Sequence, residues 1–115
     1  MPGQAWHGEW VSQSPPPQQP SVPGWASDAV DAFRTYLTRE RDRSPHTVRA
    51  YAGDVRACLV WCAADGSEGL ADVSLAQLRQ WLGTLASGGA ARATLSRRSA
   101  AVRTFFAWAR RSGRI

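Results

Sequence analysis

The sequence predicts an all-α fold, a small bundle of four helices, and three observations support this. Apolar residues recur at spacings of three and four in four segments, helix-capping residues flank those segments, and no segment reads as a convincing strand. The chain has 115 residues. Its proline-rich N-terminal stretch leaves about 90 of them to bury a core, which is enough for one domain of this kind.

Residues 1–26 are predicted to be a disordered tail, and residues 27–115 to be the folded domain. The tail holds Pro15 to Pro17, Pro20 and Pro23, one charged residue and little aliphatic material. Its two tryptophans, Trp6 and Trp10, are four residues apart and leave a short docking motif open as an alternative.

The first helix is predicted over residues 28–41. Ser27 is a suitable N-cap, and Asp28 and Asp31 would complement the helix dipole in the first turn. Its inward stripe is expected to be Val30, Phe33 and Leu37, with Tyr36 at the edge.

The second helix is predicted over residues 45–64, because Ser44 can cap it and Pro45 fits its first position. One face is expected to meet the core. That face carries Val48, Tyr51, Ala52, Val55, Cys58, Leu59 and Cys62. The opposite face is basic and small-residued, with His46, Arg49, Ala50, Gly53 and Ala57, and Arg56 on its flank.

Ser74 should cap a third helix over residues 75–87, and Gly113 should end a fourth over residues 91–112. The third helix would turn Leu75, Leu78, Leu82 and Leu85 inward, with Trp81 closing the core. In the fourth, the predicted buried arc is Leu95, Val102, Phe105, Phe106 and Ala109. Its outer surface would hold Arg92, Ser96, Arg97, Ser99, Arg103, Thr104, Trp108, Arg110 and Arg111.

Cys58 and Cys62 are predicted to be reduced core residues in a cytosolic protein. A zinc site would need two more ligands, and the only histidines are His7 and His46, so no metal or other cofactor is expected. No apolar run is long enough to span a membrane.

The charge of the chain is divided unevenly along its length. Residues 1–72 hold six arginines and all nine acids, a net charge of −3, whereas the last 43 residues hold eight arginines and no acid. These sum to +5. A stretch without carboxylates can approach a polyanion without local repulsion, which favours nucleic acid as the partner of the fourth helix.

Two motifs carry a resemblance to a known family. Ser44, Thr47, Tyr51, Asp54 and Val55 match the pattern S-x-x-T-x-x-x-Y-x-x-D-[LV] of the N-terminal core-binding domain of Xer-type tyrosine recombinases. Residues 94–108 are similar to the last helix of that domain, usually written T-x-x-R-R-L-S-A-L-R-x-F-[FY], with Ser99-Ala100 in place of its Leu-Ser. The resemblance covers about residues 27–115 and implies an orthogonal, SAM-like four-helix bundle of crossed hairpins.

The resemblance also implies a function, which is binding of double-stranded DNA at a recombination half-site as one half of a clamp. Protomers of a full-length recombinase would assemble as a tetrameric synapse. Tyr51 and Asp54 are expected to be structural. The expected DNA contacts are His46, Thr47, Arg49, Gly53, Arg56, Arg97, Ser99 and Arg103.

This chain is predicted to be catalytically inert. It has no Lys, no His after His46 and no Tyr after Tyr51, so the catalytic set of a tyrosine recombinase is absent. Two alternatives stay open. One is a helical protein-interaction adaptor with a solvated basic face, using Trp61, Trp81 and Trp108 or the tail tryptophans, and the other is a stand-alone regulator that competes with a recombinase for its site.

Overall fold

The computed structural model describes residues 21–115, which form a bundle of α-helices. These are α2 (Gly24–Arg39), α3 (Pro45–Ala64), α4 (Leu75–Ser87) and α5 (Arg92–Arg111), with a short 3-10 turn, η1 (Leu70–Asp72), before α4. No strand occurs within the described residues, so the predicted all-α, four-helix class is confirmed. The predicted bounds of α3 and α4 are right, and those of α5 are right to within one residue.

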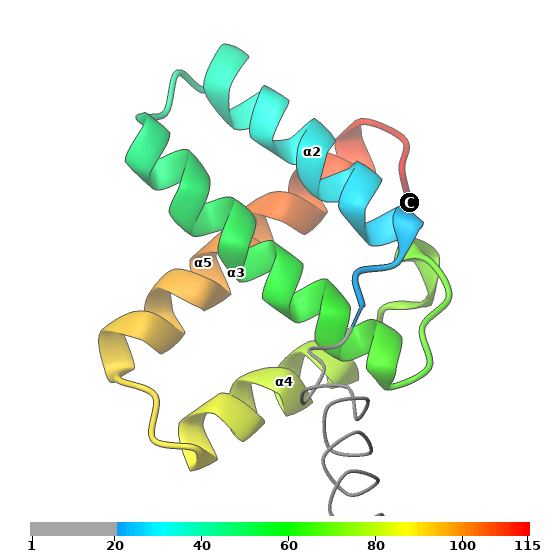
Figure 1. The fold of residues 1–115 in the computed structure, drawn as a ribbon, viewed down its shortest axis with the longest axis vertical. Helices are drawn as coiled ribbons and strands as arrows, with labels where there is room; N and C mark the ends of the chain where they lie inside the picture. Colours follow the sequence, from blue (N-terminus) through cyan, green and yellow to red (C-terminus); the bar gives the residue numbers. More distant parts are fainter. Residues whose placement is uncertain (1–20) are drawn as a thin grey trace, which may run out of the picture.

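The helices form two hairpins that cross. Figure 1 shows α3 running through the centre of the molecule and crossing α5, with α2 beside α3 and α4 at the opposite side of the bundle. Helix α3 contacts the other three helices, and α4 also packs on α5. The crossed arrangement of an orthogonal bundle is therefore present.

Two helix starts form as the sequence predicted. The Oγ of Ser44 accepts a hydrogen bond from the Thr47 amide at 3.2 Å, and Pro45 occupies the first turn of α3. Ser74 and Gln77 form a reciprocal capping box at the start of α4. Both caps satisfy amides that a helix leaves unpaired at its N-terminus.

The predicted start of the first helix was wrong. Helix α2 begins at Gly24, so Ser27 lies inside the helix rather than at its cap. The extra turn is stabilised by burial, because Ala26 is fully buried and Trp25 packs against the core. Residues 24–26 of the predicted tail are thus helical, and residues 1–20 lie outside the described part. Helix α2 ends at Arg39, before Asp42 adopts a left-handed φ of 50°.

The main core lies where α2, α3 and α5 meet. Phe33 and Phe105 are fully buried, and their rings pack edge to face with centroids 5.2 Å apart. Aromatic rings in this arrangement stabilise a core beyond their burial alone. Leu37, Val55 and Leu59 are among the other residues of this cluster.

A second, smaller cluster joins α3, α4 and α5. It contains Cys58, Cys62, Trp81 and Val102, so the predicted burial of Trp81 and of both free cysteines is confirmed. A hydrogen bond with Cys62, together with burial, raises the pKa of the Cys58 thiol. Such a thiol stays protonated at neutral pH and packs as an apolar residue.

Two predicted orientations were wrong, those of Trp108 and Leu75. Trp108, expected on the outer surface of α5, is 7% exposed because this helix packs against Tyr36 and Phe33 of α2 as well as against α3. Leu75, expected inside, is 62% exposed at the start of α4. Tyr51, Leu95 and Phe106, also expected in the core, are half-buried, and Tyr51 and Phe106 pack against the core as predicted.

Substitutions of a buried aromatic residue and of the exposed Leu75 should differ in their effect on stability. We expect Phe105→Ala to lower the free energy of unfolding by about 3–5 kcal/mol, because it removes a buried ring and leaves a cavity. Leu75→Ala is the matched control and should change it by less than about 0.5 kcal/mol. Urea denaturation measures both, and similar losses would contradict the placement of these two side chains.

Candidate nucleic-acid interface

One face of α3 is exposed and carries the candidate contacts closest to its N-terminus. His46, Arg49 and Gly53 recur at three and four residues and are all exposed. A Cβ built on Gly53 would meet no atom within 4 Å, so the packing of the chain itself does not require glycine there. This position leaves room for the backbone of a partner to approach.

Two other candidates on α3 take part in contacts or hollows within the protein. The hydroxyl of Thr47 accepts a hydrogen bond from the Ser44 hydroxyl at 3.1 Å, which ties the half-buried Thr47 to the helix cap. Arg56 is exposed but lines a hollow against α2 that also contains Asp31 and Arg34.

An ion-pair cluster around Asp54 joins α3 to α5. The carboxylate of Asp54, only 2% exposed, accepts two hydrogen bonds from Arg97, from Nε to Oδ2 and from Nη2 to Oδ1, each 2.8 Å long. The buried Nε of Arg98 lies 3.3 Å from Oδ1, an ion-pair distance without hydrogen-bond geometry. The Arg98 guanidinium also lies 5.7 Å from the ring centre of Trp81.

This cluster fixes the orientation of Arg97 while leaving part of it available. The hydrogen bonds to Asp54 raise the pKa of Arg97, so its guanidinium remains charged. An arginine has five N–H donors, and two of them point at Asp54. The remaining three belong to a side chain that is 45% exposed, and one carboxylate faces two arginines, so the junction keeps a net positive charge.

The remaining candidates on α5 lie on a different side of that helix. Arg103 follows Arg97 by six residues, which places the two about 120° apart around the helix axis. Arg103 is exposed, and it lines hollows formed with Leu75 and Leu78 of α4 and with Tyr36 of α2. Ser99 is half-buried. The structure thus brings Arg97 to α3 and leaves Arg103 on the far flank.

Sequence reasoning missed the pairing of Asp54 with Arg97 and Arg98. All three residues stood in the matched motifs, and Asp54 was expected to be structural, but nothing local links positions 43 residues apart. The burial of Trp108 was also missed, whereas that of Trp81 was predicted. Trp81 and Trp108 are 3% and 7% exposed, so the apolar edge on which the adaptor alternative relied is largely closed.

Two further observations concern the described part of the chain. Between residues 21 and 115, no three His, Cys, Asp or Glu side chains gather closely enough to hold a metal ion. None of the helices described there combines the length and apolarity that crossing a bilayer requires.

The fold and the exposed arginines define a class of protein, a small basic bundle of crossed helical hairpins suited to binding a polyanion. Residues 30–113 match the family described as phage integrase, N-terminal SAM-like domain. The chain belongs to this family.

Two relatives place it more closely. The chain is 49% identical over 86 residues to the tyrosine recombinase XerC of Mycobacterium sp. (strain KMS) and 48% identical over 84 residues to that of Mycobacterium tuberculosis (strain ATCC 25177 / H37Ra). Each alignment covers 73% of this chain and 28% of the relative. No solved structure matches the chain. The resemblance to the N-terminal domain of Xer-type tyrosine recombinases is confirmed.

Asp54 offers a direct test of the ion-pair cluster. We expect Asp54→Asn to lower the free energy of unfolding by about 2–3 kcal/mol, because it leaves two arginines without a counter-charge; the partly exposed Arg97 keeps the loss below that of a fully buried pair. Asp28→Asn, an exposed acid on α2, is the control and should change stability by less than about 0.5 kcal/mol. Thermal unfolding at neutral pH measures both, and an unchanged Asp54→Asn variant would contradict the cluster's structural role.

Proposed function

We propose that this chain binds double-stranded DNA at a site-specific recombination half-site, as the N-terminal half of a recombinase clamp. The observation that carries the proposal is the pair of crossed helices, α3 and α5. Both helices expose arginines, and Asp54 orients the guanidinium of Arg97 where they cross. The relatives bear the name tyrosine recombinase, which supports recombination as the process served.

The exposed face of α3 is suited to lie against a major groove. A helix of 20 residues is about 30 Å long, and the groove of B-form DNA is about 12 Å wide, so one face can enter it lengthwise. Gly53 allows the backbone of α3 to come close, and Arg49 can reach a phosphate or a guanine edge. Arg97 presents its free donors at the junction, where they are oriented before any DNA arrives.

The proposed division of labour gives binding to this chain and strand cleavage to another part of a longer protein. Phosphate contacts by arginines position a protein on DNA, whereas only a few side chains read base edges. The chain spans 28% of the length of its relatives, so strand exchange and the tetrameric assembly of protomers belong to the proposal for the whole protein.

Binding should depend steeply on salt. If the chain neutralises about four to six phosphates, the logarithm of the association constant should fall against the logarithm of salt concentration with a slope near −4 to −5. We expect Arg49→Gln to make this slope less negative by about 1, and Arg79→Gln on α4 to leave it unchanged. Fluorescence anisotropy with a labelled duplex measures both. Absence of affinity at low salt, or affinity indifferent to salt, would overturn the proposal.

Gly53 should respond differently from a second exposed helical glycine. Both Gly53→Ala and Gly83→Ala should raise the free energy of unfolding by about 0.5–1 kcal/mol, because each removes a helix-interior glycine with open space around it. We expect Gly53→Ala to weaken duplex binding and Gly83→Ala to leave it unchanged. A steric cost of about 1 kcal/mol would weaken affinity about fivefold. Equal affinities for the two variants would show that DNA does not approach α3 at this position.

A further inference from the structure

Two arginines that are 70 residues apart in the sequence, Arg41 and Arg111, meet at the hydroxyl of Tyr36. The Nη2 of Arg111, on α5, donates to this oxygen at 2.9 Å, and the Nη1 of Arg41, in the link between α2 and α3, donates at 3.4 Å. The Arg111 guanidinium also lies 6.0 Å from the centre of the Tyr36 ring. Tyr36 itself is 8% exposed, so its ring is held firmly.

The hydroxyl group of Tyr36 keeps one unused hydrogen. A phenol oxygen can accept two hydrogen bonds and donate one. Both acceptor positions face the arginines, and no acceptor for its own O–H lies among residues 21–115. Thr104, nearby on α5, already donates its hydroxyl hydrogen to the Ala100 carbonyl at 2.9 Å. Of the two hydroxyl groups here, only that of Tyr36 therefore keeps a free hydrogen to donate, beside the unused N–H donors of the arginines.

These groups line an open hollow of about 280 Å³ that is rich in positive charge. Its lining contains three arginines and no carboxylate, and in the described part of the chain none of these arginines lies within ion-pair distance of an acid. The lining residues are Tyr36, Arg41, Arg103, Thr104, Ala107 and Arg111. Guanidinium and phenol donors together favour an anion with several oxygens, above all a phosphate.

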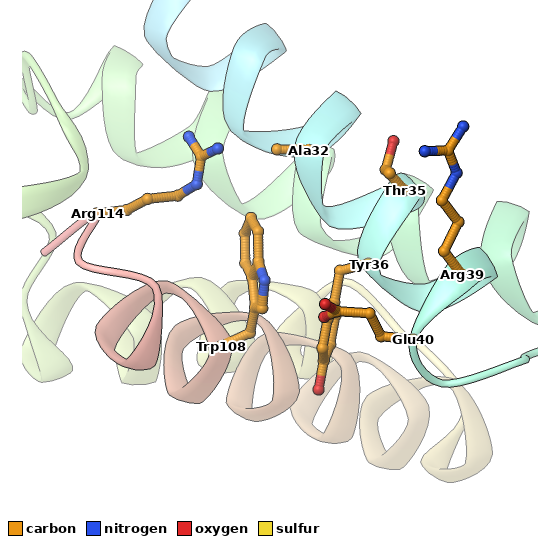
Figure 2. A pocket seen from close by; sticks show the side chains of 7 residues that line it. All are labelled: Ala32, Thr35, Tyr36, Arg39, Glu40, Trp108 and Arg114. Carbon is orange, nitrogen blue, oxygen red and sulfur yellow. The ribbon is translucent and has the colours of Figure 1, made fainter.

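A neighbouring hollow differs from this one in its charge. Figure 2 shows Tyr36 reaching from α2 beside Trp108, with its hydroxyl end pointing away from Arg39 and Thr35. That hollow, of about 530 Å³, also contains the carboxylate of Glu40. The donors of Tyr36 and Arg111 thus serve the acid-free hollow, and Arg39 lines only the other one.

Part of the lining of the acid-free hollow, Thr104 and Arg111, lies on the same side of α5 as Arg97, whereas Arg103 lies at its far edge. Arg111 follows Arg97 by 14 residues, which places the two about 40° apart around the helix and about 21 Å apart along it. That distance is about six base-pair steps of 3.4 Å. A duplex that contacts Arg97 along this edge of α5 can therefore reach the hollow with another phosphate.

We propose that this hollow is a phosphate-binding subsite that seats one backbone phosphate of the bound duplex. The proposal rests on the proposed DNA-binding function and adds Tyr36, Arg41 and Arg111 to the expected contacts. Arg111 and Arg41 supply charge, and Tyr36 donates its free hydrogen to a phosphate oxygen. Arg103 closes the outer rim.

Three variants and one control test the subsite by duplex binding across a salt series. We expect Arg41→Gln and Arg111→Gln each to weaken affinity about three- to tenfold and to make the salt slope less negative by about 1. Tyr36→Phe keeps the ring and the net charge, so it should weaken affinity without changing the slope. Arg39→Gln removes a nearby charge outside the hollow and should change affinity less than about twofold.

The controls separate this proposal from the one it rests on. Circular dichroism must show unchanged helicity, and the exposed Arg41 keeps the test valid if Tyr36→Phe does not fold. If the three variants bind like Arg39→Gln while Arg49→Gln binds more weakly, the subsite is wrong and DNA binding stands. Titration with inorganic phosphate, followed by amide NMR, is the second arm. Phosphate shifts at Arg111 without any effect of the variants on duplex affinity would make this a small-anion site and overturn its assignment to DNA.

Discussion

The buried carboxylate of Asp54 is the constraint on which the rest of this structure depends. It lies at the crossing of α3 and α5, where a charge removed from water is tolerated only if it is paired. Arg97 and Arg98 supply that pairing, so it favours the register in which these residues meet. An apolar contact at the same place would hold the helices together, but it would not specify which residues meet. The same interaction aims the free donors of Arg97 outward, and in this way a structural requirement also prepares a binding group.

The aromatic cluster fixes the C-terminal end of α5 against α2, as Asp54 fixes the N-terminal part of α5 against α3. Phe33, Tyr36, Phe105 and Trp108 pack with ring centres between 5.2 and 6.2 Å apart, which fixes α2 against α5. Because the Tyr36 ring is held within this cluster, its hydroxyl emerges at a fixed point, and Arg111 is held beside it. Helix α5 is therefore anchored at both ends by contacts that also orient arginines. A surface prepared before binding loses less conformational freedom when a partner arrives.

The sequence predicted most of what is local and little of what is long-range. The starts of α3 and α4 were predictable because Ser44 and Ser74 act on amides within three residues of themselves. The start of α2 was not, since burial of Trp25 and Ala26 outweighs the preference of Ser27 for a cap.

Trp108 was misplaced for a related reason. Helical periodicity shows that a face is buried, but it does not say that two neighbours bury it from different sides. At the candidate interface, exposure of Arg49 and Gly53 followed from the pattern, whereas the pairing of Asp54 required the fold.

The charge asymmetry has a different meaning once the fold is known. Of the eight arginines after Asp72, Arg97 and Arg98 pair with Asp54, Arg111 binds Tyr36, and Arg114 lies 5.1 Å from the ring centre of Trp108. Half of the positive charge is thus held by contacts within the protein, and loose, solvated arginines make up only the other half. A diffuse basic surface attracts any polyanion, because long-range attraction depends on net charge. Oriented guanidinium groups at set spacings instead favour a partner whose phosphates repeat at matching intervals, as they do along a duplex. The contacts that orient these arginines therefore also suit α5 to a ligand with evenly spaced phosphates.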